Sequence, residues 1–596
     1  MSQLHYGLIG NGQVSALIDQ FGKMIWACLP DPQSPSVFAH LLDDKQGGVW
    51  EFEAFTQSAA KKLKFSQEYI KNTAVLSTRV ILDERTEFQI IDFAPRYVLG
   101  RSHYRPAQLI RVLKPSRGAP EILMRFRPKL NYGLTQPHWK PGSGYLGIQG
   151  APQELYLSTP LSLNHILEET PFKLDAPLFF VLSDAQALPH LSLQQIYDEL
   201  ECTVVYWRRW CQSMVLPTEF QREVIRSAIT LKLHCFESTG AILAASTTSI
   251  PEGPEPGRTW DYRYCWLRDA YFVISAFYQL GKLEEIEGFL KFFLNVWESE
   301  ERKVLQPVYG IRGEKKLIET QIPHLRGFHG LGPVRVGNAA YSMKQLDVYG
   351  EMLLALSMLF FDERTQKLNR RYLFEVINEL ASFCKDHFNE ADAGIWEFRG
   401  THRHFLFSKL MMWAGVFQGS KVAERLGIRE LSRQWRAAVH SMSETIHAEG
   451  WKTQLGYFSQ AYDNTDADAA NLLFPYLGFM RDQDPKLKKM IRTYAELLRH
   501  GRGVFRYRSA DDFGVPKTSF IVCSFWMAEA LFRVGEVRGA KTVFKDAVSC
   551  SNPLGLLSED FDPLSGELWG NFPQCYSHAG LIHAAYRMFQ DDRRNF

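Results

Sequence analysis

The pattern of hydrophobic and polar positions changes once along the chain, near residue 195. Before it, short runs rich in β-branched and aromatic residues recur, separated by Gly, Pro, Asn and Asp as in "RGAP" and "KPGSG". The clearest runs are 73–82, 87–95, 107–115, 121–128 and 178–184. Repeated short strands with turn residues between them predict an antiparallel β-sandwich over residues 1–193.

Beyond this point apolar residues recur every three or four positions, which predicts helices. Residues 194–218 are expected to form a helical linker. After the linker, helices are expected to begin near 219, 266, 283, 340, 369, 405, 428, 465, 485, 518, 537 and 573, with Pro475 interrupting one of them. Twelve helices favour six hairpins closed into a ring over residues 219–596.

Several connections between these helices are long and rich in Trp, Tyr, Arg, His and acidic residues. They are residues 248–264, 308–340, 389–405 and 550–573. Long loops in a compact helical domain are usually functional. We therefore expect them to gather over one end of the ring and form a pocket.

Composition narrows the function classes. The 596 residues are 45% hydrophobic and 22% charged with a formal net charge of +2, so no overall field favours nucleic acid or an anionic membrane. The nine cysteines form no C-x-x-C pair, and we find neither a secretory signal nor an apolar run of the ~18 residues that a membrane span needs. A cytoplasmic protein without nucleic-acid or membrane partners is expected. Aromatic residues make up 13%, which suits a large core or a ring-lined sugar pocket.

The segment 260–277, "WDYRYCWLRDAYFVISAF", crowds polar and aromatic residues ahead of an apolar helix. Arg268 and Asp269 offer adjacent donors and acceptors, which suits the recognition of hydroxyls, and Trp266 offers an apolar ring face. The alternative is that Arg268 and Asp269 simply pair with their neighbours near a helix N-terminus.

"GIWEFRG", residues 394–400, places Glu397 beside Trp396 and two residues before Arg399. An indole can desolvate a carboxyl and raise its pKa, as a general acid needs, whereas a salt bridge to Arg399 would lower that pKa. The motif alone leaves both interpretations open.

A second acidic cluster lies in "LLSEDFDPLSGELWG", residues 556–570. One of its acids could be a general base, or the loop could be merely solvated or bind a cation. Spacing does not choose between Glu559 and Asp560. The chain lacks the motifs of nucleotide-binding loops, of zinc peptidases and of serine hydrolases. No cofactor and no metal site are expected.

Taken together, the motifs resemble glycoside hydrolase family 15, in its bacterial and archaeal glucoamylase-like and trehalase branch. The resemblance runs nearly from end to end and includes the N-terminal segment 6–44. It rests on motifs in a consistent order: "WDYRYCWLRDA", "VRVGNAAYSMKQLDVYGE", "GIWEFRG", "CSFWMAEAL" and "LLSEDFDP…GNFPQCYSHAGLIHAA".

The resemblance implies an N-terminal β-sandwich joined to an (α/α)6 barrel that hydrolyses α-glucosidic bonds with inversion. It identifies Glu397 as the general acid and Glu559 as the general base, whose carboxyls should lie roughly 6.5–9.5 Å apart so that water fits between base and sugar. It also implies a substrate-binding role for the residues expected around the terminal glucose, which are Trp266, Arg268, Asp269, Trp396 and Tyr576.

The expected activity is that of an exo-acting, glucoamylase-like α-glucosidase that releases β-glucose from α-linked gluco-oligosaccharides. A trehalase is the alternative within the same chemistry, and a disaccharide phosphorylase or a non-catalytic sugar-binding relic are further ones. Relatives often have a His where this chain has Phe407 and a Glu near the position of Lys517, which weakens the trehalase alternative. Linkage preference and oligomeric state, a homo-oligomer included, stay open.

Overall fold

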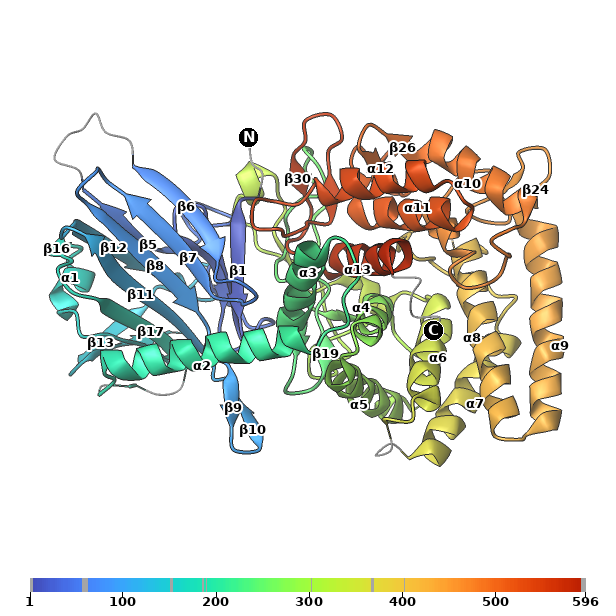
Figure 1. Ribbon diagram of the computed structural model, residues 1–596, viewed down its shortest axis with the longest axis horizontal. Helices are drawn as coiled ribbons and strands as arrows, with labels where there is room; N and C mark the ends of the chain where they lie inside the picture. Colours follow the sequence, from blue (N-terminus) through green and yellow to red (C-terminus); the bar gives the residue numbers. More distant parts are fainter. Residues whose placement is uncertain are drawn as a thin grey trace.

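The computed structural model describes residues 4–55, 63–150, 154–184, 187–188, 190–301, 303–365, 369–400 and 402–590. The described chain forms an N-terminal β-sandwich beside a helical barrel, and one long helix runs from the first part to the second (Figure 1). The ends of the predicted parts 1–193 and 219–596 lie outside the described residues. The exact boundaries of these parts stay a prediction.

Two antiparallel sheets build the sandwich. The first has the order β1-β2-β3-β5-β12-β16, with β4 beside β3, and the second has the order β13-β14-β15-β17-β11-β8-β7-β6. The strands of the first sheet are β1 (Tyr6–Gly10), β2 (Ser15–Asp19), β3 (Met24–Cys28), β4 (Ser36–Phe38), β5 (Val49–Ala54), β12 (Glu121–Arg127) and β16 (Phe172–Lys173). Those of the second are β6 (Lys64–Tyr69), β7 (Leu76–Ile81), β8 (Glu87–Phe93), β11 (Gln108–Arg117), β13 (His138–Gly142), β14 (Tyr145–Gln149), β15 (Leu155–Ser158) and β17 (Leu178–Asp184). A short helix α1 (Leu163–Leu167) and a hairpin of β9 (Tyr97–Leu99) and β10 (Ser102–Tyr104) complete this part.

The sandwich core forms because alternate residues of each strand point between the sheets. Strand β7 shows this plainly, since buried and half-buried residues alternate along it. Ile18 and Trp50 of the first sheet meet Ile90 and Phe180 of the second in one buried cluster. The predicted antiparallel β-sandwich is confirmed, and each of the five predicted runs contains one of its strands.

Helix α2 (Leu193–Gln212) occupies the segment expected to be a helical linker. Ser192 and Gln195 form a reciprocal capping box at its start, which satisfies backbone N–H groups of the first turn. Ile196 packs with Val112 and Phe179 on the outer face of the second sheet. Near its C-terminus Trp207 belongs to the large core of the barrel. The segment therefore packs against both parts of the molecule.

The barrel consists of an inner and an outer ring of six elements each, counted over the described residues. The inner ring is α4 (Leu267–Gln279), α6 (Asp347–Phe361), α8 (Leu406–Arg425), the 3-10 helix η4 (Ala469–Leu473), α11 (Ile521–Arg533) and α13 (Cys575–Phe589). The outer ring is α3 (Gln221–His234), α5 (Leu283–Ser299), α7 (Arg370–Asp386), α9 (Arg429–Thr445), α10 (Pro485–Leu498) and α12 (Val537–Val548). The predicted (α/α)6 barrel is confirmed.

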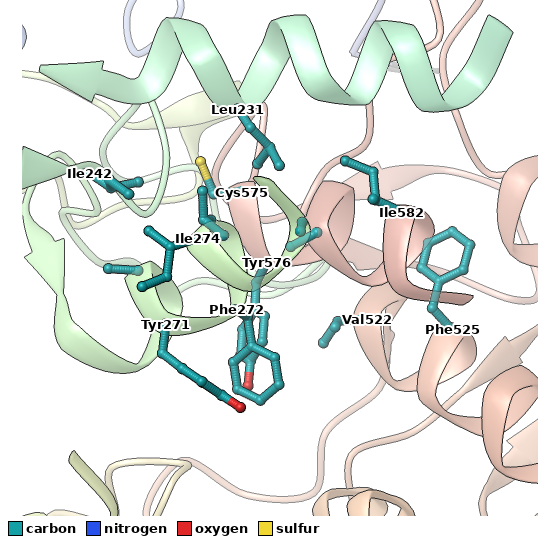
Figure 2. Packing of buried hydrophobic residues seen from close by; sticks show 14 of the residues in the cluster. Leu231, Ile242, Tyr271, Phe272, Ile274, Val522, Phe525, Cys575, Tyr576 and Ile582 are labelled. Carbon is teal, nitrogen blue, oxygen red and sulfur yellow. The ribbon is translucent and has the colours of Figure 1, made fainter. Parts of the chain in front are cut away.

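The two rings differ in their pattern of apolar residues, as their positions require. Inner helices such as α4 and α13 are buried on nearly every side. Outer helices such as α7 and α10 bury one apolar stripe and expose the opposite face. Figure 2 shows Leu231 of α3, Phe272 of α4, Phe525 of α11 and Tyr576 of α13 packed in the shared core.

Two predicted helices differ from the structure. The element expected near 465 is the short η4, which Asp468 caps by accepting a hydrogen bond from Ala470 N, and Pro475 follows it without a backbone donor to continue a helix. The helix expected near 340 begins at Asp347 as α6. Before it lies the 3-10 helix η2 (Ala339–Ser342), capped by Asn338 and ended by the extended backbone of Met343.

Connection lengths place the loops. Each short connection joins an inner helix to the following outer one, such as residues 280–282 and 534–536. The long connections run from an outer helix to the next inner one, so they gather at the N-terminal ends of the inner helices. They contain the short ladders β18 (Cys235–Phe236), β19 (Ala241–Ile242), β20 (Cys265–Trp266), β21 (Val308–Tyr309), β22 (Thr320–Gln321), β23 (Arg335–Val336), β24 (Trp451–Lys452), β25 (Tyr457–Phe458), β26 (Arg499–His500), β27 (Gly503–Val504), β28 (Ser519–Phe520), β29 (Asp560–Phe561) and β30 (Leu568–Trp569), with the single turns η1 (Phe328–Gly330) and η3 (Ile446–Gly450).

Among the residues that the structure describes, no helix has the length and apolarity that crossing a membrane requires. The nine cysteines are free thiols, and all but Cys202 are buried.

Candidate active site

A cavity opens at the barrel end where the long connections gather. Its empty volume is ≈ 840 Å³ with the open mouth included, within the range of roughly 300–1,000 Å³ usual for small-ligand sites. All seven residues predicted for the site line it, namely Trp266, Arg268, Asp269, Trp396, Glu397, Glu559 and Tyr576. The structure thus brings the predicted residues together, whereas the role of each stays a prediction.

The floor of the cavity is formed at the N-terminal ends of two inner helices. Arg268, in the first turn of α4, donates through Nη1 to Gln345 Oε1 at 2.7 Å and to Asp347 Oδ2 at 3.3 Å. Its neighbour Asp269 is 6% exposed, and burial raises the pKa of this carboxyl to about 6. The ring of Tyr576 packs against Phe272 with centroids 4.9 Å apart (Figure 2). This floor offers fixed donors and acceptors for sugar hydroxyls, beneath an aromatic lining.

Glu397 lies on one wall and takes its hydrogen bonds from the other predicted residues, not from its sequence neighbour. Trp266 Nε1 donates to Glu397 Oε1 at 2.7 Å, and Arg268 Nη2 lies 3.3 Å from the same oxygen. Arg399 pairs instead with Glu319, with Nη2 3.0 Å from Oε2. The salt bridge between Glu397 and Arg399 that the sequence left open is therefore not formed.

The backbone explains why Glu397 and Arg399 face different ways. Glu397 has a φ of 59°, in the left-handed region that is unusual for a residue with a side chain. Glu397 N donates to Gly394 O at 3.2 Å, which closes a tight turn. The turn directs Glu397 towards the cavity and carries Arg399 to its rim.

Glu559 lies deeper, with only 2% of its surface exposed. Tyr262 donates its phenol proton to Glu559 Oε1 at 2.8 Å, and Asn571 N lies 3.4 Å from Oε2. Gly570 leaves room for the carboxyl, because a Cβ there would come within 2.6 Å of Glu559 Oε2. Burial first, then the charges of Asp560 and Glu252, raises the pKa of Glu559 well above its usual range.

The structure separates Glu559 from Asp560, which spacing could not do. Glu559 lines the cavity, whereas Asp560 turns into the ladder of β28, β29 and β30 and accepts a hydrogen bond from Thr518 Oγ1 at 3.2 Å. This arrangement supports Glu559 as the candidate base.

Two aromatic side chains connect the glutamates. Tyr262, bonded to Glu559, packs edge-on against Trp266 with centroids 5.3 Å apart, and Trp266 donates to Glu397. Trp396, beside Glu397 in the chain, donates through Nε1 to Asp468 Oδ2 at 2.9 Å, and its ring packs against Phe520 and Trp526. Both carboxyls are therefore held in one rigid aromatic wall.

Sequence reasoning missed several lining residues, among them Tyr262, Glu252, Arg506 and Asn338. Tyr262 could have been found from the alternation of the extended segment before α4. Its neighbour Arg263 points the other way, where it is fully buried and donates to Asp261 within the barrel and to Tyr132 of the sandwich. The others lie on loops whose sequence shows no periodic pattern.

The two departures from the family pattern lie outside the cavity lining. Phe407 is buried in the core within α8. Lys517 is exposed and pairs with Glu255 on the surface. Among the described residues, no group of three or more His, Cys, Asp and Glu side chains is arranged to hold a metal ion.

Comparison with known proteins agrees with the fold and the site. A sequence model of glycosyl hydrolases family 15 matches residues 219–586, and one described as trehalase-like, N-terminal matches residues 4–174. The fold also matches the crystal structure of a bacterial glucoamylase complexed with acarbose, with a TM-score of 0.71 and 14% identity over 99% of this chain and 94% of that one.

The related sequences correct the expected activity. A protein of Mycobacterium tuberculosis named trehalase is 31% identical over 98% of this chain and 89% of its own length. A protein of Thermoplasma volcanium, also named trehalase, is 29% identical over 98% of this chain and 93% of its own length. The prediction of a glucoamylase-like exo-α-glucosidase is therefore wrong, and the inference drawn from Phe407 and Lys517 against a trehalase fails with it. The chain belongs to glycosyl hydrolases family 15 and is a glycoside hydrolase that acts on a carbohydrate.

Proposed function

We propose that this protein is a trehalase that hydrolyses α,α-trehalose with inversion at one of the two anomeric carbons. The observation that carries the proposal is the similarity of the whole chain to proteins named trehalase, combined with a cavity lined by two glutamates on one aromatic wall.

In the proposed complex, one glucose of trehalose lies on the cavity floor. Arg268 and Asp269 bind its hydroxyls, Tyr576 and Trp396 shape its pocket, and Trp266 holds Glu397 in place. The other glucose is the leaving group and points towards the open mouth.

Hydrolysis then needs two proton transfers. Glu397 gives its proton to the glycosidic oxygen as the bond breaks, while the Glu559 carboxylate takes a proton from the water that attacks the anomeric carbon from the opposite face. The oxocarbenium-like transition state passes to glucose of inverted configuration. Afterwards Glu559 holds the proton of the water and Glu397 is ionised, so exchange with solvent restores both groups.

The stereochemistry gives a direct test. Inversion at one anomeric carbon yields one β-glucose from the attacked ring and one α-glucose from the leaving group. Proton NMR of the first products from trehalose, recorded before mutarotation, should show α and β anomers in equal amounts. Two α anomers would reject the inverting mechanism, and the absence of hydrolysis would reject the trehalase.

Phosphate dependence tests the remaining alternatives in the same experiment. A phosphorylase would form a sugar phosphate in phosphate buffer and no free glucose pair. A sugar-binding relic would bind trehalose without turnover. Equal amounts of α- and β-glucose, with no sugar phosphate, would exclude both.

A further inference from the structure

A tight hairpin lies at the mouth of the cavity, on the connection between α10 and α11. Asp511 N donates to Gly514 O and Gly514 N donates to Asp511 O, each at 3.1 Å, so Asp512 and Phe513 form its tip. Gly514 has a φ of 94°, which a residue with a side chain rarely adopts. We call residues 511–514 the mouth hairpin. Asp511, Asp512 and Phe513 all line the cavity, although sequence reasoning did not single them out.

One side of the mouth hairpin is fixed to the loop that carries Glu397. The Asp512 carboxylate accepts hydrogen bonds from the backbone N–H groups of Arg399 and Gly400. The contact is close, because a Cβ at Gly400 would lie 2.8 Å from Asp512 Oδ1. The tip therefore rests two to three residues beyond the candidate acid.

The other side of the mouth hairpin is fixed to the segment that carries Trp260. Arg258 donates to the Asp511 carboxylate and, at 2.8 Å, to Gly514 O. The Phe513 ring meets Trp260 edge-on with centroids 5.1 Å apart. The mouth hairpin therefore spans the mouth from the acid loop to the opposite wall.

Exposure shows which end of the cavity the mouth hairpin faces. The floor residues Asp269 and Tyr576 are 6% and 3% exposed, whereas Phe513 is 43% exposed. A glucose held at the closed floor leaves the glutamates at the middle of the cavity. The leaving group must then occupy the space between Glu397 and the mouth hairpin.

We propose that the mouth hairpin limits this space to a single sugar, and so makes the protein select a disaccharide over longer α-glucans. The proposal rests on the proposed trehalase function. The Phe513 ring bars a third sugar ring, and the Asp512 carboxylate, by binding the acid loop, holds that ring in place over the leaving sugar. Arg399 completes the rim, with its guanidinium 4.5 Å from the centroid of the Trp260 ring.

The test replaces the two tip residues singly, as Asp512→Ala and Phe513→Ala. Both residues are exposed, so neither replacement removes core packing. Val515→Ala is the matched control, because Val515 is exposed on the same connection and lies outside the cavity lining. Thermal unfolding of all three variants checks that they fold.

The readout is the ratio of kcat/KM for maltotriose to kcat/KM for trehalose. In Asp512→Ala and Phe513→Ala we expect the ratio to rise about tenfold or more, because a looser mouth weakens the binding of the leaving glucose and admits a third sugar. The loss on trehalose should appear mainly as a higher KM. In Val515→Ala the ratio should stay within about twofold of the wild-type value.

The wild-type protein is also assayed with α-glucosyl fluoride, whose leaving group is one atom and makes no contact with the mouth hairpin. Hydrolysis of the fluoride without hydrolysis of trehalose would reject the proposed function, and with it the selection of this disaccharide. Hydrolysis of trehalose with an unchanged ratio in both tip variants would overturn the role of the mouth hairpin alone.

Discussion

The hydrogen bond from Tyr262 to Glu559 gives a quantitative prediction. The phenol donates to Glu559 Oε1 at 2.8 Å in a fully buried setting, so it stabilises the ionised carboxylate that a base needs. A hydrogen bond to a charged group is worth about 1.5–3 kcal/mol, and Tyr262→Phe removes it without changing the shape of the ring. The pKa of Glu559, already raised by burial and by Asp560 and Glu252, should rise further.

The consequence follows from the sign of the change. Because the base acts when ionised, a higher pKa moves the acidic limb of the pH profile to higher pH. Below that limb, kcat/KM for trehalose should fall roughly 10- to 150-fold, which is the loss of 1.5–3 kcal/mol expressed as a ratio. The assay is the pH dependence of kcat/KM for wild type and variant.

Tyr264→Phe is the matched control. It removes the same hydroxyl two residues away, but Tyr264 OH accepts its hydrogen bond from Gly337 N at 3.1 Å and lies outside the cavity lining. Its acidic limb should stay in place. If the limb of Tyr262→Phe moved to lower pH, or did not move in a folded variant, Glu559 would not be the group whose ionisation limits the rate.

Three further predictions concern the proposed acid, the proposed base and the join between the two parts. Glu397→Gln and Glu559→Gln should each lower kcat for trehalose by about 10²- to 10⁴-fold with unchanged thermal unfolding, measured as glucose release, whereas Glu255→Gln on the surface should keep its rate. Asp560→Asn should move the acidic limb to lower pH, because after burial its charge contributes most to the raised pKa of the base, and a limb at higher pH would contradict this. Arg263→Met should lower the free energy of unfolding by about 3–5 kcal/mol in urea, since it leaves a buried aspartate without its partner, and a change under about 1 kcal/mol would count against the argument.

Local patterns predicted the fold well because they act over a few residues. The run 178–184 coincides with β17, and the helices expected near 283, 485 and 537 begin there, since strand alternation and helical spacing show directly in the sequence. The prediction failed near 465, where η4 is too short to set up a helical period before Pro475.

The site could be predicted only through the resemblance. Glu397 and Glu559 lie on separate connections, so no local pattern shows that they share a cavity, and the family motifs had to supply that link. The partners that set their environment lie further still from any motif logic. Tyr262 was visible only as one of several aromatic residues, and the mouth hairpin belongs to a loop whose role depends on where it packs.

The resemblance also misjudged the substrate, for a reason that the structure makes physical. Phe407 and Lys517 were weighed as changes near the leaving group, but one is buried in α8 and the other is on the surface. Distance along the chain from a motif did not measure distance from the bond to be cleaved.

The two interpretations of "GIWEFRG" differ in the direction of one turn. Arg399 lies two residues from Glu397, so composition alone favours their pairing, and an extended chain would place both side chains on one face. The left-handed backbone at Glu397 breaks that geometry and sends Arg399 to Glu319 and Trp260 on the rim. The same turn leaves the carboxyl of Glu397 facing the cavity, bonded to Trp266 and open to a glycosidic oxygen. One strained residue thus separates a surface ion pair from a proton donor, and its rim partner Arg399 becomes part of the mouth that meets the leaving sugar.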